Sequence, residues 1–117
     1  MLAPPMPKVP LSIDLLLAPQ DAARGPTPKN SGGKTHHREV TVLGHTTPGS
    51  IVFSDSGLGD YSFTGQALAA DARGNFALRV RNGEGLTNYN FLAIDPYGQQ
   101  VIRAFPVLWL DFGASRT

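Results

Sequence analysis

The sequence of 117 residues contains no cysteine, so the chain has no disulfide scaffold, no zinc-thiolate site and no thiol nucleophile. It is also poor in charge, because Asp, Glu, Lys and Arg make up 16% of the residues and leave a formal net charge of +1. A balance this close to neutral gives no electrostatic reason to expect a strongly charged partner. We therefore expect neither nucleic acid nor a membrane among the partners.

Long hydrophobic runs are missing too. No stretch approaches the 18 consecutive apolar residues that indicate a transmembrane helix. The apolar segment 11–17 is interrupted by Asp14, and the prolines before it and the single early cation, Lys8, do not form the basic start of a signal peptide. We expect no signal peptide in this sequence, so the chain is either cytosolic or, as we favour, a module of a longer exported protein at the cell surface or outside the cell.

Glycine and proline, in contrast, are abundant. The 13 Gly and 10 Pro are too many for long helices but are typical of an all-β chain with many turns. Hydrophobic residues at 41% are sufficient for a real core, and a chain of this length forms one domain. These numbers exclude a helical bundle and a two-domain protein.

Apolar and polar residues alternate with a period of two in several segments, which predicts strands with one buried face. We expect strands at 9–17, 40–42, 51–53, 76–80 and 89–93, a weaker one within 61–70, and a last one over 100–112. Pro106 cannot donate to a ladder, so it implies an edge position, a bulge or a sheet switch in that last strand. The predicted core consists of Val40, Val42, Ile51, Phe53, Phe76, Leu78, Val80, Tyr89, Phe91 and Ala93.

Two connections share the pattern Asp-x-x-Gly, namely 71–75 and 95–99. In each, the carboxylate of Asp71 or Asp95 can accept backbone N–H bonds, while the Gly takes a left-handed conformation, so both are predicted as tight hairpins. About seven short strands with such turns predict an all-β fold, an antiparallel two-sheet Ig-like β-sandwich.

The predicted domain covers 9–113, between a proline-rich linker at 1–8 and a tail at 114–117. Within it, 21–38 has no large aliphatic or aromatic residue, and we expect a long, flexible, disordered loop there. The alternative is that the loop grips an acidic partner through a basic cluster. This cluster consists of Lys29, Lys34, His36, His37 and Arg38.

Four blocks in order resemble the bacterial Ig-like (Big-type) domains. They are the opening strand at 11–19, the block VTVLGHTTPGSIV at 40–52, ADARGNF at 70–76 and FLAIDPYG at 91–98. The family pattern has an opening strand, V-T-V-x-G-x-T-x-P-G-x-x-V, A-D-x-x-G-N-F, and A-x-D-x-x-G before the last strand. Two departures are the basic loop, where the family is commonly rich in Asp and Gly, and the apolar ending at 107–112, which suggests contact with a neighbour.

The resemblance implies a non-catalytic structural or adhesive module of a secreted or cell-surface bacterial protein. Its expected partners are neighbouring domains of a longer chain, or a glycan or protein at the cell surface. The alternative is a carbohydrate- or calcium-dependent ligand-binding module. For sugar stacking, the candidate ligand contacts are Tyr61, Tyr97 and Trp109.

Residues for catalysis or metal binding form no recognisable motif. His36, His37 and His45 have no acidic or thiol ligand at a suitable spacing, so we expect no metal site. Ser54, Ser56, Asp55 and His45 contain the residue types of a hydrolase triad but lack the G-x-S-x-G elbow. The acidic residues considered for calcium form no D-x-D-x-D-G loop, and they are Asp55, Asp60, Asp71, Asp95 and Asp111. We expect no enzyme and no cofactor.

Overall fold

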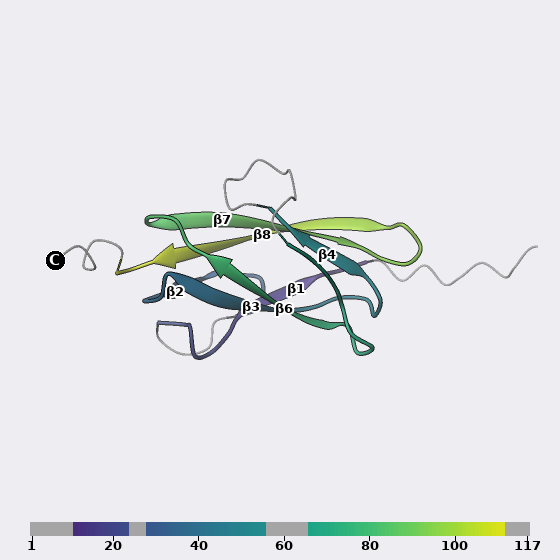
Figure 1. Ribbon diagram of the computed structural model, residues 1–117, viewed down its shortest axis with the longest axis horizontal. Coiled ribbons are helices and arrows are strands. Elements are labelled where there is room, and N and C mark those ends of the chain that lie inside the picture. Colours follow the sequence, from purple (N-terminus) through teal and green to yellow (C-terminus); the bar gives the residue numbers. More distant parts are fainter. Residues whose placement is uncertain (1–10, 24–27, 56–65, 112–117) are drawn as a thin grey trace, which may run out of the picture.

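The computed structural model describes residues 11–23, 28–55 and 66–111 (Figure 1). Within these ranges the chain forms eight β-strands and no helix. The strands are β1 (Asp14–Leu17), β2 (Gly33–Thr35), β3 (Glu39–His45), β4 (Ile51–Ser54), β5 (Ala67–Ala69), β6 (Asn75–Arg81), β7 (Leu86–Ile94) and β8 (Gln100–Trp109).

These strands form two sheets that pack as a sandwich. The three-stranded sheet has the order β1-β3-β6, and the five-stranded sheet has the order β2-β8-β7-β4-β5. Figure 1 shows β4, β7 and β8 in one layer above β1, β3 and β6 in the other. All pairings are antiparallel except that of β2 with β8, which is parallel. The predicted all-β, two-sheet sandwich is confirmed, with this one parallel pair as a departure.

The core lies between the two sheets. On β1 and β6 the alternation in the sequence is reproduced in the burial, since Leu15, Leu17 and Leu78 are fully buried and their neighbours along the strand are not. From the five-stranded sheet, the rings of Phe91 and Phe105 meet at 70° with centroids 6.5 Å apart. Each buried side chain of this size stabilises the fold by about 1.5–3 kcal/mol. The facing apolar surfaces therefore hold the sheets together.

The expected burial of β4 is wrong. Ile51 is exposed and Phe53 is half-buried, whereas Val52 between them is fully buried in the core. The segment 51–53 is apolar at every position, so alternation alone does not show which face turns inward. Pairing decides it, because Val52 lies opposite Ala93, which belongs to the buried face of β7.

Of the two predicted hairpins, one is confirmed. The turn 95–99 joins β7 to its antiparallel neighbour β8. The turn 71–75 has the expected local structure, with a bond of 2.9 Å from Gly74 N to Asp71 O. It nevertheless joins β5 to β6, which belong to different sheets. The Asp-x-x-Gly pattern specifies a tight turn and does not specify whether the flanking strands pair.

The segment expected as an irregular loop, 21–38, contains the strand β2. The N–H of Ala23 donates to Lys34 O at 2.8 Å, and the N–H of Leu110 donates to Thr35 O at 2.8 Å. Asn30 Oδ1 accepts from Leu15 N at 2.8 Å, which ties the segment to β1. A short strand can pair with the edge of a sheet through backbone hydrogen bonds alone, without apolar side chains. Because β2 has no apolar periodicity, the sequence pattern does not predict it. The predicted flexibility of the loop stays a prediction.

Pro106 lies in β8, which has β2 on one side and β7 on the other, but at Pro106 the side toward β2 is unpaired, so the expected edge position is present locally. The bond of 2.9 Å from Trp109 N to Gly85 O marks a hydrogen-bonded pair, so alternation makes Asn88 and Pro106 a non-bonded pair. The nitrogen of Pro106 therefore faces away from β7. On that side β2 pairs with β8 only from Val107 onward, so no ladder bond is lost at the proline.

Candidate binding surface

The outer face of the three-stranded sheet carries charged residues beside an apolar row that consists of Leu16, Leu43 and Ala77. Glu39 on β3 and both Arg79 and Arg81 on β6 are exposed. Arg79 Nε lies 3.9 Å from Glu39 Oε1, and Arg79 Nη1 donates to Thr41 Oγ1 at 3.3 Å. This face has the mixed charges of an ordinary solvated surface.

The five-stranded sheet is different, because its strands contain only two charged residues, Lys34 and Arg103. Lys34 lies on the edge strand β2. Arg103 turns toward the other sheet, since its Nε donates to Ile13 O at 2.8 Å. The outer side of β4, β5, β7 and β8 is consequently without charge.

We call this surface the apolar sheet face, and it consists of Ile51, Phe53, Ala67, Ala69, Leu92, Ile94, Ile102 and Ala104. All eight alternate along their strands with residues that turn inward. Four of them form one continuous row across the sheet. In register order this row is Ala67, Phe53, Leu92 and Ile102.

Several members of the apolar sheet face are open to solvent. Ile102 is 50% exposed and Ile51 is 39% exposed, while Leu92 and Ile94 between them on β7 are half-buried. Isolated exposed apolar residues are common on protein surfaces, whereas a contiguous exposed group on one sheet face is a candidate interaction site. The two outer faces therefore differ in charge, and the uncharged one exposes a contiguous group of apolar residues.

Polar groups at one border of the apolar sheet face bond to each other. Asn90 Nδ2 donates to Asp55 Oδ2 at 3.0 Å, and the N–H of Asp55 donates to Asn90 O at 3.1 Å. Both residues are buried. Because these polar groups bond to each other within the chain, they keep these hydrogen bonds when a partner covers the surface and removes water.

The structure does not gather the aromatic residues proposed as ligand contacts. Tyr97 lies in the turn 95–99 and is 60% exposed. Trp109 lies at the far end of β8, roughly 30 Å away at about 3.3 Å per residue. It is only 9% exposed, and Arg38 Cζ lies 5.5 Å from its ring centroid, so its ring is occupied within the chain. Tyr61 lies outside the described residues.

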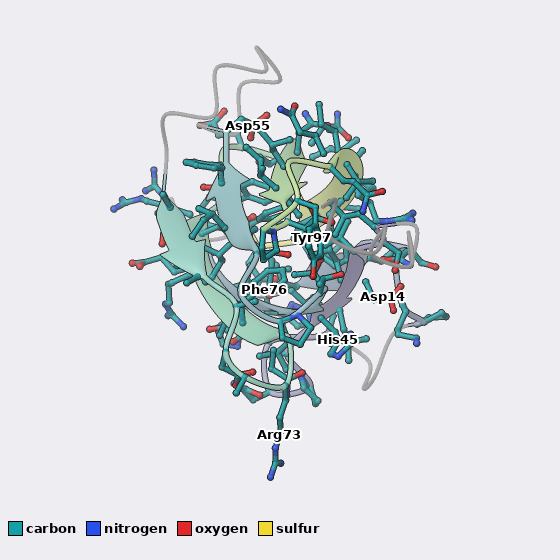
Figure 2. All side chains as sticks on the ribbon, turned by 90° about the vertical axis from the view of Figure 1, so that its right-hand side faces the viewer. Asp14, His45, Asp55, Arg73, Phe76 and Tyr97 are labelled. Carbon is teal, nitrogen blue, oxygen red and sulfur yellow. The ribbon has the colours of Figure 1, made fainter. Side chains whose placement is uncertain are left out.

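The residue types of a hydrolase triad are also separated. Figure 2 shows Asp55 and His45 on opposite sides of the sandwich, with His45 next to the turn that carries Arg73. His45 Nε2 lies 2.9 Å from Arg73 O, and Ser54 Oγ accepts from Gln66 N at 3.0 Å. Ser56 lies outside the described residues.

Two of the three histidines have side-chain partners within the chain. His36 Nδ1 lies 2.8 Å from Asp111 Oδ1, at the opposite end of β3 from His45. In the part of the chain that the structure describes, no group of three or more His, Asp or Glu residues is placed to hold a metal ion. Asp60 lies outside that part.

The two turn aspartates act as the sequence predicts. Asp71 Oδ1 accepts from Arg73 N at 2.8 Å and from Asn75 N at 2.9 Å. The N–H groups of Asn75 and Arg73 favour the charged form, so they lower the pKa of the Asp71 carboxyl below its usual value. Asp95 accepts in the same way from the N–H groups of Tyr97 and Gln99.

Over the described ranges, the chain has no helix long and apolar enough to span a membrane. Comparisons with protein-family models, curated proteins and solved structures find no match for this chain. The resemblance to the bacterial Ig-like domains consequently stays a prediction that rests on the four sequence blocks.

Sequence reasoning identified only part of the apolar sheet face. The alternation on β7 already indicates that both of its sides are apolar, through Leu92 and Ile94. The sequence pattern predicts Ile51 and Phe53 as core residues, and it gives no sign that β5 and β8 contribute to this face. A usable indication was present in the near absence of charge from every segment that enters the five-stranded sheet.

Proposed function

We propose that this chain is a non-catalytic structural or adhesive module that works by binding a neighbour through the apolar sheet face. The observation that carries the proposal is the contrast between the two outer faces. One presents Glu39, Arg79 and Arg81 to solvent, and the other presents a continuous uncharged row that ends in Ile102. The hydrophobic effect favours burial of the uncharged face, whereas the charged side chains of the other face are favourably hydrated.

The same proposal places the module in a larger exported bacterial protein, as an Ig-like unit. Its support is the order of the four sequence blocks at 11–19, 40–52, 70–76 and 91–98. A spacer or adhesive unit needs a rigid scaffold and a contact surface, and it needs no convergent catalytic groups. The two-sheet sandwich with its apolar sheet face supplies the scaffold and the surface.

Site-specific photo-cross-linking tests this function in the full-length protein that contains the chain, produced in its own cells. A photoreactive amino acid replaces Ile102 on the apolar sheet face, or Ala77 as the matched control. Both residues are exposed, and Ala77 lies on the outer side of β6 in the other sheet.

We expect a discrete cross-linked product from position 102 and none from position 77. The product of position 102 identifies the partner by mass. Equal cross-linking from both positions, or none from position 102, contradicts the proposed function.

A further inference from the structure

We propose that the apolar sheet face binds a second copy of the same chain, so that two five-stranded sheets pack face to face in a two-fold dimer. This inference rests on the proposed function and names the partner. It follows from three properties of the surface, which are its charge, its shape and its size.

The charge of the surface excludes several kinds of partner. The eight residues of the apolar sheet face contain no acidic or basic side chain, and Lys34 is the only charged residue on the outer side of this sheet's strands. An acidic, basic or nucleic-acid partner would lose hydration of its charges against this face and gain no opposite charge. The partner surface must therefore be uncharged and apolar as well.

A second copy supplies such a surface. In a two-fold interface the same patch contributes from both sides, and residue i contacts residue j as j contacts i. Charged patches resist this arrangement because like charges meet, but Ile51, Leu92 and Ile102 meet their equivalents without repulsion. The apolar sheet face is thus compatible with itself.

The shape of the surface also fits sheet-on-sheet packing. Alternate residues of β7 and β8 project outward over the whole length of these strands, in register from the Ile94–Gln100 pair to the Leu86–Leu108 pair. Two such faces pack about 10 Å apart with strands at about −30°, as the two sheets of a sandwich do. Ala67, Ala69 and Ala104 are small, so they leave room for Ile51 and Ile102 of the other copy to pack against this face.

The size of the surface limits it to a weak dimer. The strands β4, β5, β7 and β8 have four, three, nine and ten residues, and at a rise of about 3.3 Å per residue and a spacing of about 4.8 Å they cover roughly 400 Å² per copy. This is about half of the ~800 Å² per partner of a standard interface. We expect a dimer that dissociates on dilution instead of an obligate one.

Sedimentation equilibrium over a micromolar to millimolar concentration series tests this proposal. The wild-type chain of 12.5 kDa should approach twice this mass as its concentration rises. Ile102→Lys and Ala104→Lys should remain monomeric over the same range, because each places a charge within the interface. The matched control Ala77→Lys adds the same charge to the outer face of the other sheet and should associate as the wild type does.

Residues 77, 102 and 104 are all exposed, and circular dichroism verifies that each variant is folded. A wild-type chain that stays monomeric to millimolar concentration overturns the proposal. Dimerisation that persists equally in all three variants also overturns it, since it would place the contact elsewhere, for example at a sheet edge. If the wild type is monomeric but position 102 still cross-links to a different protein, the proposed function holds and only the second copy is excluded.

Discussion

Single residues of this chain fix its turns, and the two Asp-x-x-Gly turns show how differently similar residues are placed. Gly74 and Gly98 both have positive φ, 84° and 86°. A Cβ on Gly74 would lie 2.0 Å from Thr46 O, whereas a Cβ on Gly98 would meet nothing within 4 Å. The sequence predicts both turns correctly, but it cannot show that only one of them is packed against another strand's end.

Substitution by alanine should separate these two glycines. Gly98→Ala suffers only the strain of a left-handed conformation, and we expect a loss of about 1–2 kcal/mol in unfolding free energy. Gly74→Ala must also move the turn away from Thr46 and break the 2.8 Å bond from Thr46 N to Gly74 O. Its loss should reach about 3 kcal/mol or more. Urea unfolding of both variants measures the difference, and equal losses would show that the contact with Thr46 does not matter.

Asp71 makes stability depend on pH. Its lowered pKa means that the folded state favours the carboxylate, so its contribution is complete above the unfolded value of 3.8 and disappears as the pH falls through the lower folded value. Asp71→Asn keeps an accepting oxygen but removes the charge. We expect this variant to be less stable than the wild type at neutral pH and equally stable in acid. Denaturant unfolding over a pH series tests this, and a stability difference that is independent of pH would contradict it.

At the scale of elements, the sequence predicts strands well where only one face is apolar. β6 alternates strictly, and its inward residues were predicted correctly. β4 is apolar at Ile51, Val52 and Phe53, and its orientation is set by pairing with β7, which is information that no local pattern contains. β2 is held by backbone bonds at a sheet edge and has no apolar residue to reveal it. The ambiguity of β4 is also why the sequence does not predict the apolar sheet face, since it predicts Ile51 and Phe53 as core residues.

The orientation of β4 can be tested with threonine, which fits a strand at either position. Val52→Thr places a hydroxyl in the fully buried core, and we expect a loss of about 1–3 kcal/mol. Ile51→Thr leaves the hydroxyl in water and should cost less than about 1 kcal/mol. Thermal melts of the dilute proteins compare the two. The reverse order would mean that Ile51, and not Val52, faces the core.

At the scale of the whole molecule, the two sheets differ in the residues on their outer faces. The three-stranded sheet has the solvated exterior of a monomeric protein, through Glu39, Arg79 and Arg81. The five-stranded sheet has a buried inner face and an outer face that resembles a second core. Together they give a molecule with one charged outer face and one outer face without charge. This division appears only when the sheets are assembled, since β4 and β7 lie side by side in the sheet but are distant in the sequence.

The isoleucines allow the most direct test of whether the apolar sheet face is the contact between two copies of the chain. The chain has four of them, and Ile51, Ile94 and Ile102 lie on the apolar sheet face, while Ile13 is fully buried in the core. In a sample labelled only at the isoleucine δ1 methyl groups, NMR spectra recorded over a dilution series should show three resonances that shift with protein concentration and one that does not. If all four remain fixed up to millimolar concentration, or if Ile13 shifts as much as the others, the apolar sheet face is not the contact between copies.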